Sequence, residues 1–116
     1  MQLWLRQCTF TTNISRLVLE INKKGYFCRF EEFYRTPEQA KLNAEKGIGI
    51  QNSLHCERLA GDLTLFDSNG KPLSKSEDYK WVGDIWESLH PLNRWGGNFN
   101  DGNHFSMKLS SDDPRS

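Results

Sequence analysis

The chain has 116 residues, with 15 Lys and Arg against 15 Asp and Glu, so its formal net charge is zero and its length predicts one domain over residues 1–116. The balanced charge argues against a nucleic-acid-binding protein, which needs an excess of Lys and Arg to neutralise phosphates. No run of 18 apolar residues is present, which excludes a membrane-spanning helix. The three cysteines are too few and too widely spaced for a disulfide framework or a cysteine-based zinc site.

The N-terminal third predicts one helix. Apolar residues recur there at the helical spacing i, i+3, i+4, i+7, namely at Ile14, Leu17, Val18 and Ile21. Asn13 or Ser15 is the expected start and Gly25 the expected end, while residues 1–12 show no clear period. The same N-terminal segment lacks a basic region followed by an apolar stretch, so no Sec-type signal peptide is expected. The expected location is therefore the cytoplasm.

A strand and a second helix are expected next. Residues 26–34 are rich in aromatic side chains and predict a strand that ends at Arg35. Thr36-Pro37-Glu38-Gln39 has the residue types of a helix start, with Thr36 as the N-cap and Gln39 closing a capping box. That helix should end before Gly47, and residues 48–52 should form a loop.

In the second half, the sequence predicts a strand that includes Asp62 and Thr64 on one face, followed by a turn at residues 67–70 and a polar loop. A helix should begin near Ser76 and end at His90-Pro91. Residues 94–102 are expected to be a loop, 103–109 a last strand, and 110–116 a frayed polar tail. Few, interleaved helices and strands predict an α+β fold, a small and mainly antiparallel sheet with flanking helices.

The candidate metal-binding residues lie in two stretches of the sequence. The first, residues 53–62, contains His55 and Asp62, and the second, residues 95–105, contains His104. Two imidazoles and one carboxylate can occupy three corners of a zinc tetrahedron and leave the fourth for water. In one straight strand His55 and Asp62 would face opposite ways, so a bend is expected at residues 57–59. Cys56 adjoins His55 but should point to the opposite face, so it is not expected to be a ligand.

Asp101 stands three residues before His104. A carboxylate beside the metal can take a proton from water and later deliver one to a leaving amine. Just upstream, the ring of Trp95 offers one wall of a cleft, and Gly96 and Gly97 would let a substrate approach the backbone closely.

Ser53-x-His55, Ala60-x-Asp62 and Trp95-Gly96-Gly97…Asp101-x-x-His104-Phe105 resemble the motifs of the D-alanyl-D-alanine carboxypeptidase/L-alanyl-D-glutamate endopeptidase family of zinc peptidases. The likeness covers roughly residues 26–109 and looks strongest to the small endolysins of bacteriophages. It implies the hedgehog/DD-peptidase fold and one zinc ion per chain.

Matched residue by residue, the resemblance implies that His55, Asp62 and His104 bind zinc and that Asp101 and Arg35 are catalytic. Substrate contacts are implied for Ser53, Trp95, Gly96 and Gly97. Ser53 and Trp95 also have simpler interpretations, as a turn cap and as core packing.

Two positions depart from the family pattern. Arg58 replaces a usual glycine, so either it narrows the cleft or the loop differs. Asp101 stands where many members have a glutamate. In this respect the chain resembles the endopeptidase branch of the family, in which aspartate occurs at this position.

The resemblance implies a hydrolase of peptidoglycan stem peptides, and a monomer is the default expectation. Its expected activity is that of an L-alanyl-D-glutamate endopeptidase. A D-Ala-D-Ala carboxypeptidase or dipeptidase on the same scaffold, and a non-catalytic zinc module that binds cell-wall fragments, are the alternatives. Two biological roles are compatible with the expected lack of a signal peptide. One is a phage endolysin for host cell lysis that is released by a holin, and the other is a bacterial enzyme that acts on cytoplasmic wall precursors.

Overall fold

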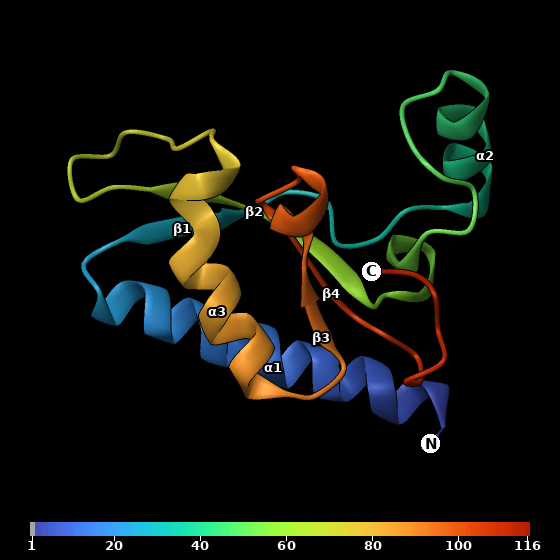
Figure 1. Cartoon of the computed structure of the whole chain (residues 1–116), viewed down its shortest axis with the longest axis horizontal. Coiled ribbons are helices and arrows are strands. Elements are labelled where there is room, and N and C mark those ends of the chain that lie inside the picture. The colour runs from blue at the N-terminus through green and yellow to red at the C-terminus, as the bar shows by residue number, and fades with distance from the viewer. Residues whose placement is uncertain (1) are drawn as a thin grey trace.

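A computed structural model describes residues 2–116 and contains a four-stranded antiparallel sheet flanked by helices (Figure 1). The strands are β1 (Phe27–Phe30), β2 (Ala60–Phe66), β3 (Asn93–Trp95) and β4 (His104–Met107), in the spatial order β1-β2-β4-β3. The helices are α1 (Leu3–Lys23), α2 (Pro37–Glu45) and α3 (Lys80–Leu89), with 3₁₀ helices η1 (Leu54–Glu57), η2 (Ser76–Tyr79) and η3 (Gly96–Phe99). The α+β class with a mainly antiparallel sheet is therefore confirmed.

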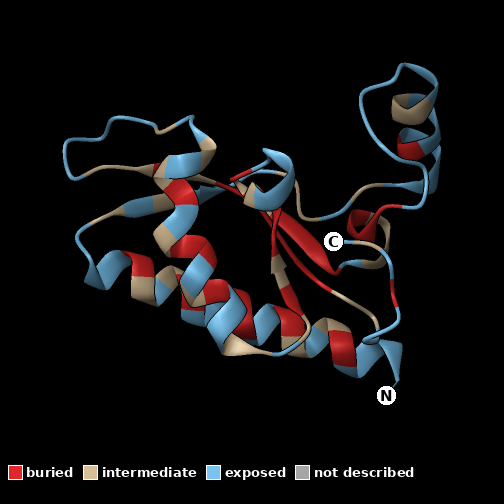
Figure 2. Ribbon diagram, in the orientation of Figure 1, coloured by how far each residue is buried: buried red, intermediate tan, exposed pale blue. Residues whose placement is uncertain are grey.

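The hydrophobic core lies between one face of the sheet and helices α1 and α3. Side chains alternate along β2, so that Leu63 and Leu65 are buried in this core whereas Asp62 and Thr64 belong to the opposite face. Trp86 of α3 is fully buried and packs edge-on against Phe10 of α1. Buried residues follow β2, β4 and the inner faces of α1 and α3 in Figure 2, whereas α2 is mostly exposed. The helices thus cover one face of the sheet and leave the face of Asp62 for other segments.

The first helix is longer than the sequence predicted. It begins at Leu3, so Asn13 and Ser15 lie inside it and do not cap it. The buried stripe extends towards the N-terminus through Arg6, Phe10 and Asn13. Two of these three residues are polar, which hides the helical period from a pattern of apolar residues. Met1 of the expected irregular segment lies outside the described residues.

The expected strand over residues 26–34 is shorter, although its end still pairs with β2. Beyond Phe30, the N–H of Glu31 donates to the carbonyl of Asp62, and the N–H of Asp62 donates to the carbonyl of Glu32. Thr36 caps α2 as predicted, accepting a hydrogen bond from the N–H of Gln39. The reciprocal half of the capping box is replaced by a bond from the Gln39 side chain to Asn43.

The C-terminal third contains two further differences. The expected loop over residues 94–102 includes most of β3 and all of η3, two elements too short to give a periodic signal. The expected frayed tail is held in place, with Asp113 buried and Arg115 paired to η1. In residues 2–116, no helix combines the length and the apolar character that crossing a bilayer requires.

Candidate metal centre and cleft

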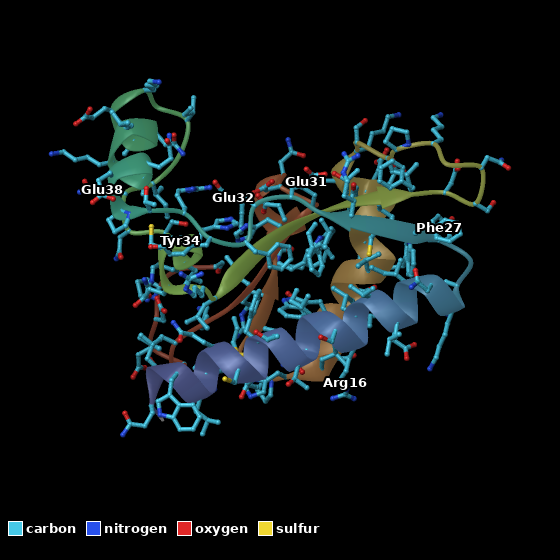
Figure 3. All side chains as sticks on the ribbon, turned by 180° about the vertical axis from the view of Figure 1, so that it is seen from behind. Arg16, Phe27, Glu31, Glu32, Tyr34 and Glu38 are labelled. Atoms are coloured by element: carbon cyan, nitrogen blue, oxygen red, sulfur yellow. The ribbon has the colours of Figure 1, made fainter. Side chains whose placement is uncertain are left out.

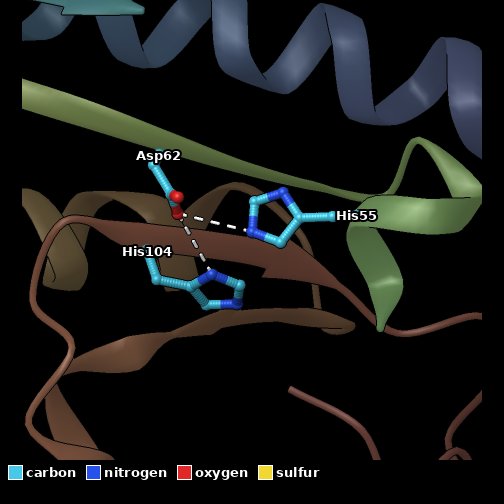
Figure 4. Close-up of side chains that lie close together, drawn as sticks. All are labelled: His55, Asp62 and His104. Atoms are coloured by element: carbon cyan, nitrogen blue, oxygen red, sulfur yellow. Dashed lines mark hydrogen bonds and ion pairs between the residues drawn. The ribbon is translucent and has the colours of Figure 1, made fainter. Parts of the chain in front are cut away.

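His55, Asp62 and His104 come together on the sheet face that the helices leave free (Figure 4). Asp62 and His104 are paired residues on the antiparallel strands β2 and β4, so their side chains leave the same face of the sheet. Nδ1 of His104 lies 3.3 Å from Oδ1 of Asp62, and Nε2 of His55 lies 3.5 Å from the same oxygen. One ligand atom from each residue falls within 4.8 Å of the other two, an arrangement that can hold a metal ion.

His55 reaches this site because the chain turns sharply after it. Ser53 caps η1 by accepting a hydrogen bond from the N–H of His55 at 3.1 Å. Arg58 then adopts a left-handed conformation with φ of 57°, and β2 begins two residues later. The predicted bend at residues 57–59 is confirmed, and it brings His55 and Asp62 together although they are seven positions apart in the sequence.

The same geometry answers the question raised by Arg58. Its positive φ is the conformation that glycine adopts most readily, so the loop keeps the shape that a glycine would give it. The Arg58 guanidinium stacks 4.0 Å from the ring centre of Tyr34, and Arg58 is not among the residues that line the cavity. The large side chain therefore leaves the cleft open.

A cavity of about 540 Å³ opens onto the cluster. It is lined by the expected site residues Arg35, Ser53, His55, Asp62, Asp101 and His104. Its apolar walls come from Ile48, Ile50 and Phe99, whose side chains are largely exposed. Residues 114–116 of the tail complete the lining. The sequence carried no local signal for these apolar and tail residues, because they stand in segments without periodicity.

Trp95, Gly96 and Gly97 are not among the residues that line the cavity, and Trp95 belongs to the hydrophobic core, which agrees with its simpler interpretation. The ring of Trp95 is packed against Gly83 and Gly97, where an added Cβ would come within 2.3 Å and 2.0 Å of ring atoms. Its indole N–H donates to the carbonyl of Gly102 at 2.7 Å. Trp95 therefore packs beneath the surface of the site and supports the loop that carries Asp101.

Asp101 is held by a loop fixed from several sides. Its N–H donates to the carbonyl of Gly96, and its own carbonyl accepts from the N–H of His104. The N–H of Gly102 donates to the hydroxyl of Ser76 in η2. Oδ2 of Asp101 lies 4.0 Å from Nδ1 of His104, so the carboxylate stands beside the cluster without joining it.

Glu32 is a site residue that the sequence analysis missed. It lies on the segment that joins β1 to α2 (Figure 3) and forms an ion pair with the guanidinium of Arg35, whose Nε donates to Oε1 at 3.0 Å. The same Oε1 lies 3.7 Å from Nδ1 of His55, a buried nitrogen that has no hydrogen-bond partner among residues 2–116. Glu32 thus connects Arg35 to His55.

Electrostatics at the cluster favour a charged Asp62. Burial by itself would raise the pKa of Asp62, but hydrogen bonds from His104 and His55 outweigh it and lower the pKa to about 2. Burial would lower the pKa of His104, yet the Asp62 carboxylate raises it overall. For Asp101, burial raises the pKa, and for Arg35 the hydrogen bond to Glu32 raises it. Asp62 therefore stays ionised at neutral pH, as a metal ligand must.

Cysteines take no part in the cluster. Cys8, Cys28 and Cys56 are free thiols. The sulfur of Cys56 lies 4.0 Å from the carbonyl of Thr36, towards α2, as expected for a residue that points away from His55.

Comparisons with known proteins agree with this architecture. No protein-family model matches the chain, and no curated protein sequence matches it significantly. Among solved structures, the L-Ala D-Glu endopeptidase ChiX of Serratia marcescens has a similar fold, with a TM-score of 0.62 and 18% sequence identity. The match covers 72% of this chain and 68% of that protein. The chain therefore shares the fold of a peptidase, and its cluster has the residue types of a metal site.

Proposed function

We propose that this protein is a zinc-dependent peptidase that cuts the peptide stem of bacterial peptidoglycan at the L-alanyl-D-glutamate bond. The spacing of the donor atoms around Asp62 is the observation that carries the proposal. Two nitrogens at 3.3 and 3.5 Å from one carboxylate oxygen face the same cavity as a second carboxylate, Asp101. The fold shared with an L-Ala D-Glu endopeptidase supports the choice of substrate.

The donor set suits zinc. Ligands bound about 2.0–2.1 Å from a tetrahedral zinc ion lie roughly 3.3–3.4 Å from one another, close to both of the measured distances. His104 gives a second reason. Its Nε2 lies 3.0 Å from the carbonyl oxygen of Ser116, which only accepts, so Nε2 carries the hydrogen. In the neutral ring, the form that binds a metal, this leaves the lone pair on Nδ1, the nitrogen that faces the Asp62 carboxylate.

Asp101 and Arg35 have separate parts in the proposed hydrolysis. When bound, zinc lowers the pKa of a water molecule and polarises the scissile carbonyl. Asp101 takes a proton from that water as its oxygen attacks the carbonyl carbon, and it returns the proton to the amine as the C–N bond breaks. Arg35 lines the cavity with a positive charge, which suits both a substrate carboxylate and the negative charge of the transition state.

Mass spectrometry of purified peptidoglycan after incubation with the protein tests this proposal. The expected products are stem peptides that newly begin at D-Glu. Loss of only a terminal D-Ala would instead identify a carboxypeptidase. Zinc binding with no cleavage of any bond would identify a non-catalytic module that binds wall fragments.

A further inference from the structure

The tail after β4 joins the two segments that carry the histidines. Residues 109–116, here called the clasp, run back from β4 and lie beside η1 (Figure 1). The clasp begins just after the strand that carries His104 and reaches the short helix that carries His55. Its conformation therefore bears on the distance between these two residues.

Asp113 gives the clasp its shape. Its carboxylate accepts hydrogen bonds from the N–H groups of Leu109 and Arg115, at 3.1 and 3.0 Å. It also accepts from Nε and Nη2 of the Arg115 guanidinium, each at 2.8 Å. A nearly buried carboxylate with four donors fixes both the turn and the direction of the Arg115 side chain.

Arg115 connects the clasp to η1. Its Nη1 forms an ion pair with the Glu57 carboxylate and donates to the side-chain oxygen of Asn52 at 3.3 Å. The guanidinium is thus shared between Glu57 and Asp113, and only 14% of the Arg115 side chain is exposed. A guanidinium engaged in this way serves as an anchor, although it lines the cavity.

The anchored clasp places a backbone acceptor against His104. Nε2 of His104 donates to the carbonyl oxygen of Ser116, and the opposite ring nitrogen, Nδ1, faces Asp62. A hydrogen bond on the outer nitrogen of a metal-binding imidazole fixes the tautomer and the ring orientation. The chain of contacts Glu57–Arg115–Asp113 therefore acts on both histidines, through η1 on one side and through the Ser116 carbonyl on the other.

We propose that Arg115 is a positioning residue of the metal centre. It anchors the clasp so that the Ser116 carbonyl holds His104 with Nδ1 directed at the metal, and it fixes η1, with His55, relative to β4. The inference rests on the proposed zinc site. Its distinguishing consequence is that zinc affinity depends on side chains that contact neither the metal nor its ligands.

The test compares zinc dissociation constants of the full-length protein and its variants, measured by competition with a chelating dye. Arg115→Ala and Glu57→Gln should each weaken zinc binding by roughly 10- to 100-fold. Arg115→Lys should restore part of the affinity, because lysine keeps the charge and loses the bidentate geometry. Arg29→Ala is the matched control, since it removes an arginine from an exposed ion pair with Glu31.

Two further readouts separate positioning from folding. Circular dichroism of the metal-free variants identifies temperatures at which each is folded, and zinc affinities are compared there. In ¹⁵N spectra of the zinc-loaded protein, the Nε2–H of His104 should exchange slowly with solvent and should exchange faster in Arg115→Ala.

Zinc binding of wild-type strength in folded Arg115→Ala and Glu57→Gln would overturn the inference and leave the proposed function intact. If these variants bound zinc with wild-type affinity and turned over faster than the wild type, the tail would only cover the cavity, which would also overturn the inference. No zinc binding by the wild-type protein would refute the proposed function itself, and the inference with it.

Discussion

Asp62 and His104 face each other across two antiparallel strands, with 3.3 Å between Oδ1 and Nδ1. This pairing places a carboxylate and an imidazole on rigid strands of one sheet, while His55 enters from a helix whose position depends on the turn at Arg58. Two of the proposed ligands are thus set by the register of the sheet and the third by a loop.

Asp101→Asn should separate catalysis from metal binding. The amide cannot accept the proton from water, so turnover should fall by about 10²- to 10⁴-fold. Zinc affinity should change little, because Asp101 lies outside the cluster. His104→Ala, by contrast, should lose zinc and activity together. Turnover of muropeptides and zinc affinity are measured side by side, with the exposed Asp84→Asn as control. Normal turnover by Asp101→Asn would refute the assigned role.

Glu32→Gln should change the behaviour of Arg35. The substitution removes the negative charge that pairs with the guanidinium and that faces Nδ1 of His55. Zinc affinity should weaken by up to about tenfold, at the lower end of the range for outer partners of metal ligands. KM should also change, because Arg35 loses its fixed orientation in the cavity. The matched control is Glu31→Gln, whose carboxylate bonds Arg29 and Thr64 instead. Unchanged zinc affinity and KM in Glu32→Gln would exclude a role for this residue.

Gly96→Ala should damage the site although Gly96 itself does not line the cavity. A Cβ at this position would come within 2.2 Å of the Asp101 carbonyl oxygen and 2.8 Å of the His104 Cβ, so the loop must move. Because a displacement of about 1 Å can cost roughly 100-fold in rate, turnover should fall by that order. Ser68→Ala, in the distant turn after β2, serves as the control. Full activity in Gly96→Ala would mean that the loop tolerates a shift of Asp101.

Acid should loosen the clasp through Asp113. Hydrogen bonds from Arg115 hold the pKa of Asp113 well below its ordinary value. A carboxyl whose pKa is lower in the folded state stabilises the fold above its unfolded pKa, about 3.9, and this contribution is lost as the pH falls towards the folded pKa. The difference in unfolding free energy between the wild type and Asp113→Asn should therefore shrink as the pH is lowered from 5 to 2. Urea unfolding at several pH values measures it, and a constant difference would contradict the assignment.

The sequence alone was enough to predict the α+β class, the capped start of α2, and the bend that brings His55 to Asp62. These features depend on local signals, such as Thr36 before Pro37 or a histidine and an aspartate that must share one face. The start of α1 was missed because Arg6 and Asn13 occupy buried positions of its stripe. The three-residue strand β3 was missed because so short a segment shows no period.

The surroundings of the site depend on contacts between distant residues, which a single sequence does not display. Glu32 meets His55 from 23 positions away, and Arg115 meets Glu57 from 58 positions away. Trp95 was expected in the cleft because aromatic rings often line binding sites, but two glycines create the space that buries it. Composition indicated a polar tail, and the pairing of Asp113 with Arg115 is what orders it.

In the proposed function, a single zinc ion held by His55, Asp62 and His104 is required for peptidase activity. The most direct test is titration of metal-free protein with zinc while hydrolysis of a purified stem peptide is followed. We expect no turnover without metal and a linear rise in rate that stops at one zinc per chain, with Asp62→Ala inactive throughout. Turnover by the metal-free protein, or an Asp62→Ala variant that responds to zinc like the wild type, would contradict a zinc-dependent mechanism at this site.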